Sequence, residues 1–182
     1  MEDDEFLSGA TADPHLSTAF RQVMAGVCTP VSVVTAMADG YPHGTTVSAF
    51  ASLSLDPPMV LVSLDRGSDL LTVVQETGAF ALNVLGRDQA ALAVNFARKG
   101  ATKFADVPWD TDAGLPRLPG TCGFLACKVA KAVEGGDHIV LFGLVRTAVS
   151  ADGGAPLTYH TRAFGTHRPF HTRVSLGVGE ET

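Results

Sequence analysis

The chain has 182 residues, 46% hydrophobic and 18% charged, with a formal net charge of −6. This length suits one domain with a sizeable core, and a charged fraction below the usual value of about 25% indicates extra buried surface, most simply a dimer interface. The acidic balance argues against nucleic acid and anionic membranes as partners, and neither a targeting segment nor an apolar stretch of about 18 residues is present, so we expect a cytoplasmic protein.

The first predicted helix covers residues 17–27, with Ser17 as its N-terminal cap. Its apolar residues recur at the spacing of one helical face: Phe20, Val23, Met24 and Val27. Two later helices are expected to begin after Ser68 and after Asp88, since both side chains can cap a helix.

Strands are expected to dominate the rest of the chain. Alternating or continuous apolar runs predict strands at 31–38, 44–55, 59–64, 80–85, 123–133, 139–149 and 156–160.

Short turns join most of these strands. Asp39 and Gly40 form one turn signal, 56–58 is an Asp-Pro-Pro stop, and 134–137 is a hairpin connection. This order predicts a mainly β fold, an antiparallel barrel with helical attachments, rather than a doubly wound parallel sheet. We expect one domain at 14–168, between a disordered lead (1–13) and a loose tail (169–182).

The three cysteines, Cys28, Cys122 and Cys127, are predicted to be buried small hydrophobic residues. Their odd number argues against a disulfide framework, and the spacing of the last two on a strand makes them poor joint metal ligands. We therefore expect no metal site.

Several motifs that carry chemistry are absent from the sequence. It has no glycine-rich dinucleotide or P-loop fingerprint, no zinc-protease motif, no nucleophile elbow and no paired carboxylates in an apolar context. A reaction carried by a cofactor is compatible with these absences, because the protein then needs only to bind and orient the reacting groups.

The most informative segment is 44–58, Gly-Thr-Thr-Val-Ser-Ala-Phe-Ala-Ser-Leu-Ser-Leu-Asp-Pro-Pro. As one continuous strand it has an apolar face and a face that carries uncharged hydroxyl groups. Such a face could be the wall of a flavin site, with small residues and donors for the ring. The same pattern also describes a half-exposed strand rich in Ser and Thr, and the pattern alone leaves both interpretations open.

The segment 44–58 resembles the signature of the short-chain flavin reductases, which are the reductase components of two-component flavin-dependent monooxygenases. The similarity continues in 63–68, 80–85, Phe96 to Phe104, 136–138 and 156–159, and so covers about 17–167. The resemblance implies an FMN-binding split β-barrel, a homodimer, and reduction of FMN or FAD by NADH or NADPH. The reduced flavin would then supply a separate monooxygenase.

The resemblance also implies the site residues, none of them catalytic in the acid–base sense. The flavin ring would contact the 45–49 segment, and the ribityl chain and phosphate would approach Ser63 and Ser68. The complete set of implied flavin-binding residues is Thr45, Thr46, Val47, Ser48, Ala49, Ser63, Ser68, Asn83, Arg98, Lys99 and Phe104. His138 and Tyr159 would serve the nicotinamide nucleotide, so that hydride passes from nicotinamide to flavin.

Each of these roles has a plainer alternative. Ser68 is also an ordinary helix cap, and Arg98 with Lys99 also suits a helix C-terminus, where cations are favoured. His138 is also a turn residue, and Tyr159 also a half-buried core tyrosine. For the whole protein, the alternatives are an enzyme of the same fold with a corrinoid or quinone acceptor, and a non-catalytic flavin- or haem-binding module.

Overall fold

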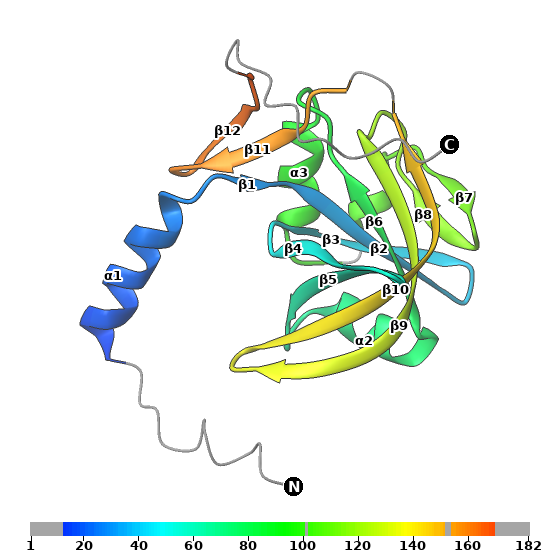
Figure 1. Cartoon of the computed structure of the whole chain (residues 1–182). Helices are drawn as coiled ribbons and strands as arrows, with labels where there is room; N and C mark the ends of the chain where they lie inside the picture. The colour runs from blue at the N-terminus through cyan, green and yellow to red at the C-terminus, as the bar shows by residue number, and fades with distance from the viewer. Residues whose placement is uncertain (1–12, 101, 152–153, 170–182) are drawn as a thin grey trace, which may run out of the picture.

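The computed structural model describes residues 13–100, 102–151 and 154–169. Its main feature is a seven-stranded sheet in which every neighbouring pair is antiparallel (Figure 1). In spatial order the strands are β3 (Tyr41–Val47), β2 (Ser32–Ala38), β6 (Ala79–Val84), β9 (Gly123–Gly135), β10 (His138–Ser150), β5 (Pro58–Asp65) and β4 (Phe50–Leu55). The predicted mainly β fold of antiparallel strands is confirmed.

Smaller elements surround this sheet. Two minor sheets consist of β1 (Thr29–Pro30), β11 (Leu157–His160) and β12 (Ala163–Thr166), and of β7 (Asp110–Asp112) with β8 (Leu115–Arg117). The helices are α1 (Pro14–Ala25), α2 (Asp69–Thr77), α3 (Ala90–Ala97) and the short 3₁₀ helix η1 (Thr102–Phe104). Figure 1 shows α1 extending away from the body of the molecule, with its C-terminal end near β11 and β12.

The sheet is closed by the chain itself at Ser48 and Ala49. The expected single strand over 44–55 is wrong, because it breaks there into β3 and β4, which are the two opposite edges of the sheet. Val47 and Phe50 are three residues apart and so lie within about 11 Å of each other. The sheet must therefore roll until its edges meet. Next to this closure the Ser63 N–H donates to the Ala49 carbonyl oxygen at 2.9 Å, which extends the pairing of β4 with β5 by one residue pair.

The core fills the rolled sheet and the space under α2. Its fully buried side chains include Val34, Val62, Phe80 and Leu141, and α2 adds Leu70, Leu71, Val73 and Val74. A second cluster, centred on Phe96, lies under α3. The barrel is thus packed with side chains, and α2 and α3 are anchored to it by their apolar faces.

Asn83 is a polar hub inside this core. It is fully buried, its Oδ1 accepts from the Leu118 N–H at 2.9 Å, and its Nδ2 donates to Thr35 Oγ1 at 3.1 Å. The same Nδ2 lies 3.3 and 3.4 Å from the carbonyl oxygens of Val33 and Pro116. Asn83 therefore joins the segment after β8 to β2 and β6.

The helix starts differ from the sequence predictions. The first helix begins at Pro14, not Ser17, because Asp13 accepts from the His15 N–H at 2.9 Å and Pro14 has no N–H to satisfy at the helix start. α1 also buries none of its residues. The helix expected after Asp88 begins at Ala90 with Gln89 at the cap position.

The predicted bounds of the β9–β10 hairpin agree better with the structure than the predicted helix starts do. The hairpin of β9 and β10 is confirmed, but its turn is only Gly136 and Asp137, since Gly135 already pairs with His138. The β7–β8 hairpin and β12 were not predicted. Of the expected lead (1–13) and tail (169–182), the structure describes only Asp13 and Pro169. Residues 1–12 and 170–182 lie outside the described residues.

The cysteines only partly follow the prediction. Cys127 is buried, and burial raises the pKa of its thiol to about 12. Cys122 is half-buried and Cys28 is exposed, so the expected burial of all three is wrong.

No helix among the described residues combines the length and apolar character needed to cross a membrane.

We predict that Gly143→Ala destabilises the barrel. A Cβ on Gly143 would lie 2.5 Å from Phe80 Cζ and 3.0 Å from Cys127 Cβ, both in the buried core. Such overpacking costs about 1–3 kcal/mol and should lower the melting temperature measured by circular dichroism. Gly135→Ala is the matched control, since its Cβ would meet nothing closer than 3.9 Å. Equal melting temperatures for the two variants would contradict the packing described here.

Candidate functional site

A cavity of about 500 Å³ lies where four separate segments of the chain meet. Its walls come from 42–45 of β3, from the end of β5 through the first residues of α2, from 97–100 at the end of α3, and from η1. Five residues predicted from the sequence line it together: Thr45, Ser68, Arg98, Lys99 and Phe104.

The cavity gathers cationic side chains. Arg98 and Lys99 follow the end of α3, and Lys103 enters from η1. Asp65 and Asp69 are the acidic residues of its wall. Three cations against two carboxylates make the cavity suited to an anionic ligand.

Lys103 was not found by sequence reasoning. Its Nζ donates to the carbonyl oxygens of Gly44 and Phe96, both at 3.1 Å. Burial lowers the pKa of this amine, and the negative charge of Asp69 partly opposes that shift. An ammonium group has three N–H donors, so one remains after these two contacts.

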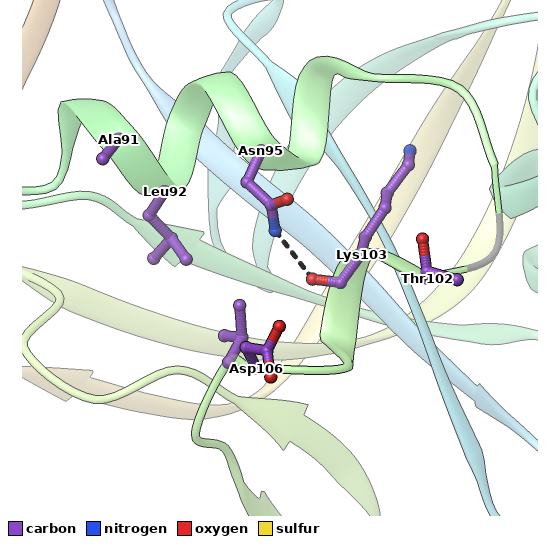
Figure 2. A pocket seen from close by; sticks show the side chains of 7 residues that line it. Ala91, Leu92, Asn95, Thr102, Lys103 and Asp106 are labelled. Atoms are coloured by element: carbon purple, nitrogen blue, oxygen red, sulfur yellow. Dashed lines mark hydrogen bonds between the residues drawn. The ribbon is translucent and has the colours of Figure 1, made fainter.

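A smaller hollow of about 300 Å³ lies beside α3 and η1. Figure 2 shows Asn95 donating to the Lys103 carbonyl oxygen at 2.7 Å, while the Lys103 side chain points away from Asp106. Lys103 therefore contributes to this hollow mainly with its backbone, and its charge belongs with the larger cavity.

The start of α2 presents backbone donors to the cavity. Ser68 holds the predicted cap position, but its hydroxyl makes no capping hydrogen bond. The preceding bend is instead fixed by Asp65, whose Oδ1 accepts from the Gly67 N–H at 2.6 Å. The free N–H groups of a helix start and its dipole favour an anion at this position.

The β3 residues are divided between the cavity and α3. Thr45 lines the cavity, and its hydroxyl lies 3.4 Å from the Phe96 carbonyl oxygen. Thr46 instead donates to the Ala93 carbonyl oxygen at 2.6 Å, and Val47 is buried. Because the strand ends there, Ser48 and Ala49 do not continue its alternation, so the 45–49 segment does not present the continuous hydroxyl face predicted from the sequence.

Two further predicted flavin residues lie outside the cavity lining. Asn83 uses its amide inside the core as described above, and it is a structural residue in this fold. Ser63 lies on β5 opposite Val140. Phe104, by contrast, both lines the cavity and packs edge-on against Phe96, with ring centroids 4.8 Å apart.

His138 lies next to the cavity without lining it. It is the first residue of β10 and pairs with Asp65, which belongs to the cavity wall. Its Nδ1 is 2.7 Å from Asp137 Oδ1, and this hydrogen bond is the main cause that lowers the pKa of the Asp137 carboxyl group.

Tyr159 is not brought to the cavity of its own chain. It lies on β11, is 37% exposed, and contacts Phe164 at a ring centroid distance of 5.2 Å. His43, which the sequence analysis does not single out, lines the cavity. No sequence signal distinguishes these histidine and tyrosine positions, because their placement depends on which strand edges meet.

Comparisons with known proteins settle the family. The family model described as "Flavin reductase like domain" matches residues 24–168. The chain belongs to this family. The resemblance deduced from the sequence is confirmed, and with it the split-barrel fold.

Two relatives of this flavin reductase-like chain are closely similar. The reductase component of 4-nitrophenol 4-monooxygenase/4-nitrocatechol 2-monooxygenase of Rhodococcus opacus is 40% identical over 155 residues, covering 85% of this chain and 83% of the relative. The FMN reductase (NADH) SmoA of Agrobacterium fabrum is 41% identical over 150 residues, covering 82% and 85%.

Among solved structures, the NADH:FAD oxidoreductase SgcE6 of Streptomyces globisporus, in complex with NAD and FAD fragments, superimposes with a TM-score of 0.82. It is 28% identical and the match covers 90% of this chain and 99% of that one.

Proposed function

We propose that this protein uses NADH or NADPH to reduce FMN or FAD bound in the 500 Å³ cavity, and releases the reduced flavin to a separate monooxygenase. The observation that carries the proposal is the cavity itself, in which Arg98, Lys99 and Lys103 meet the start of α2 in a chain of the flavin reductase family. The family favours flavin over the corrinoid, quinone and haem alternatives.

The residues present fit a flavin nucleotide. Small-ligand sites typically measure about 300–1,000 Å³, and the cavity lies within that range. Its cations and the uncapped helix start suit a phosphate group. Phe104 adds an aromatic surface, and Thr45 with the Gly44 backbone forms the β3 wall.

The chain's own contribution is to bind and orient. Ser68, Arg98 and Lys99 would hold the phosphate, and Thr45 and Phe104 would lie along the ring. A bound flavin supplies the hydride acceptor. His138, on the hairpin beside Asp65, would hold the nicotinamide nucleotide at the cavity edge. Holding both reactants together lowers the entropic part of the barrier, worth up to about 7–11 kcal/mol in well-oriented cases.

The relatives support the choice of reductant and destination. One is a reductase component of a monooxygenase and another is an FMN reductase that uses NADH. A separate monooxygenase is therefore the proposed recipient of reduced flavin.

The test is an anaerobic turnover experiment. The protein is mixed with NADH and a large excess of free FMN or FAD, and total reduced flavin is counted against protein. We expect many flavins reduced per chain, because the product leaves. Reduction that stops at one flavin per chain would rule out release, and no flavin-dependent NADH oxidation would rule out the activity.

The phosphate-binding role of the cavity cations gives a second prediction. Arg98→Gln with Lys99→Gln should weaken FMN binding about tenfold, since a charge-assisted hydrogen bond contributes about 1.5–3 kcal/mol before solvent screening. Riboflavin, which lacks the phosphate, should bind both forms equally in a fluorescence titration. Lys131→Gln removes an exposed cation of β9 that does not line the cavity, and should leave both affinities unchanged. An equal loss for FMN and riboflavin would contradict the assignment.

We also propose that the protein is a homodimer formed through α1 and the neighbouring small sheet. α1 buries no residue, and an apolar stripe along it is 46–69% exposed, formed by Leu16, Phe20, Val23 and Met24. Tyr159 and Phe164 expose further aromatic surface nearby, and the Thr161 N–H ties their sheet to the Ala25 carbonyl oxygen. An exposed apolar patch of this kind is typical of an interface between subunits.

A charge placed on this stripe should separate the subunits. Val23→Asp is expected to reduce the mass measured by light scattering from twice the 18.9 kDa of one chain to that of one chain. Gln22→Asp, on the opposite side of α1, should keep the larger mass. A wild-type mass of one chain at micromolar concentration would refute the dimer.

A further inference from the structure

Arg66 connects the hairpin tip to the loop between β5 and α2 by three contacts. Its backbone N–H donates to the Asp137 carbonyl oxygen at 3.0 Å. Its Nε donates to the Gly136 carbonyl oxygen at 2.9 Å, and its guanidinium lies 3.0 Å from Glu134 Oε2. One residue thus holds the whole turn between β9 and β10.

These contacts join the two halves of the proposed site. The residues on either side of Arg66, Asp65 and Gly67, line the cavity, whereas Arg66 itself does not. Its partners Gly136 and Asp137 immediately precede His138. The Arg66 side chain therefore contacts the turn that precedes His138, the residue assigned to the nicotinamide nucleotide, and is not part of the cavity lining.

Of the side-chain contacts of Arg66, the hydrogen bond to Gly136 is the one that can position the turn. The ion pair with Glu134 is exposed, with side-chain accessibilities of 44% and 70%, and such pairs contribute little. Gly136 has a φ of +66°, the left-handed conformation that a two-residue turn requires and that glycine adopts readily. A hydrogen bond from the Arg66 guanidinium to the Gly136 carbonyl oxygen restricts rotation of the turn, and so restricts the position of His138, which follows the turn.

The geometry points to Arg66 as a positioning residue that holds His138 at the cavity edge, so that nicotinamide nucleotide and flavin meet in one fixed orientation. This rests on the proposed function of His138. The bend at Gly67 and Ser68 is held separately by Asp65, whose backbone and side-chain oxygens accept from these two N–H groups. Loss of the Arg66 side chain should therefore affect the nucleotide and spare the flavin.

The test is a double-mutant cycle. Arg66→Ala should raise the KM for NADH about fivefold, at the low end of measured couplings between sites, with flavin Kd unchanged. In the His138→Ala background the same change should have no further effect, because the residue that Arg66 positions is gone. Glu134→Gln is the matched control and should stay within about twofold of wild type, since it keeps the bond to Gly136.

Three results would overturn the inference: an unchanged KM in Arg66→Ala, the same fold increase with and without the His138 ring, or a flavin Kd that rises as much as the KM.

A second readout does not depend on activity. The ¹H and ¹³C resonances of the His138 ring should shift in Arg66→Ala while the melting temperature stays close to that of the wild type. Unchanged ring resonances overturn the positioning role by themselves. Failure of the proposed function would appear differently, as wild-type protein that does not reduce flavin with NADH.

Discussion

The closure of the sheet at Ser48 and Ala49 is the constraint on which the rest of the structure depends. Two residues join the opposite edges of a seven-stranded sheet, so the sheet has no freedom to stay open. Rolling it up brings β3 next to β5, and α2 and α3 both pack against β2 and β3. The cavity is the space left between these elements. Its three cations all come from the short stretch 98–103, whereas the other walls come from 42–45 and 65–70, which are distant in the sequence.

Much of this arrangement could be predicted from the sequence. The apolar runs of β6 and of the β9–β10 hairpin are unambiguous because their periodicity and turn residues agree. The position of Ser68 before a helix, and of Arg98 and Lys99 after one, follows from local capping rules. Similarity to a family then placed these local features around one ligand, and the structure brings them together.

The rest depends on partners that no local pattern reveals. A strand that changes from one sheet edge to the other has the same alternation as a straight strand, so the break after Val47 carried no signal. Asn83 lies in an apolar run, and only its contacts with the segment after β8 show that its amide is needed inside the core. Lys103 follows a polar loop, where a lysine is ordinarily solvated; its two carbonyl partners come from β3 and α3.

The cavity walls span residues 42 to 104, and no single element contains enough of them to bind a ligand. A molecule that fills the cavity therefore binds the folded chain and has no site on the unfolded one. Binding of that kind adds RT ln(1 + [L]/Kd) to the free energy of unfolding, or about 2.7 kcal/mol at a ligand concentration one hundred times Kd. The resistance of this barrel to heat and proteases is thus tied to how much ligand surrounds it, and a cell depleted of that ligand would hold a less stable population of the same protein.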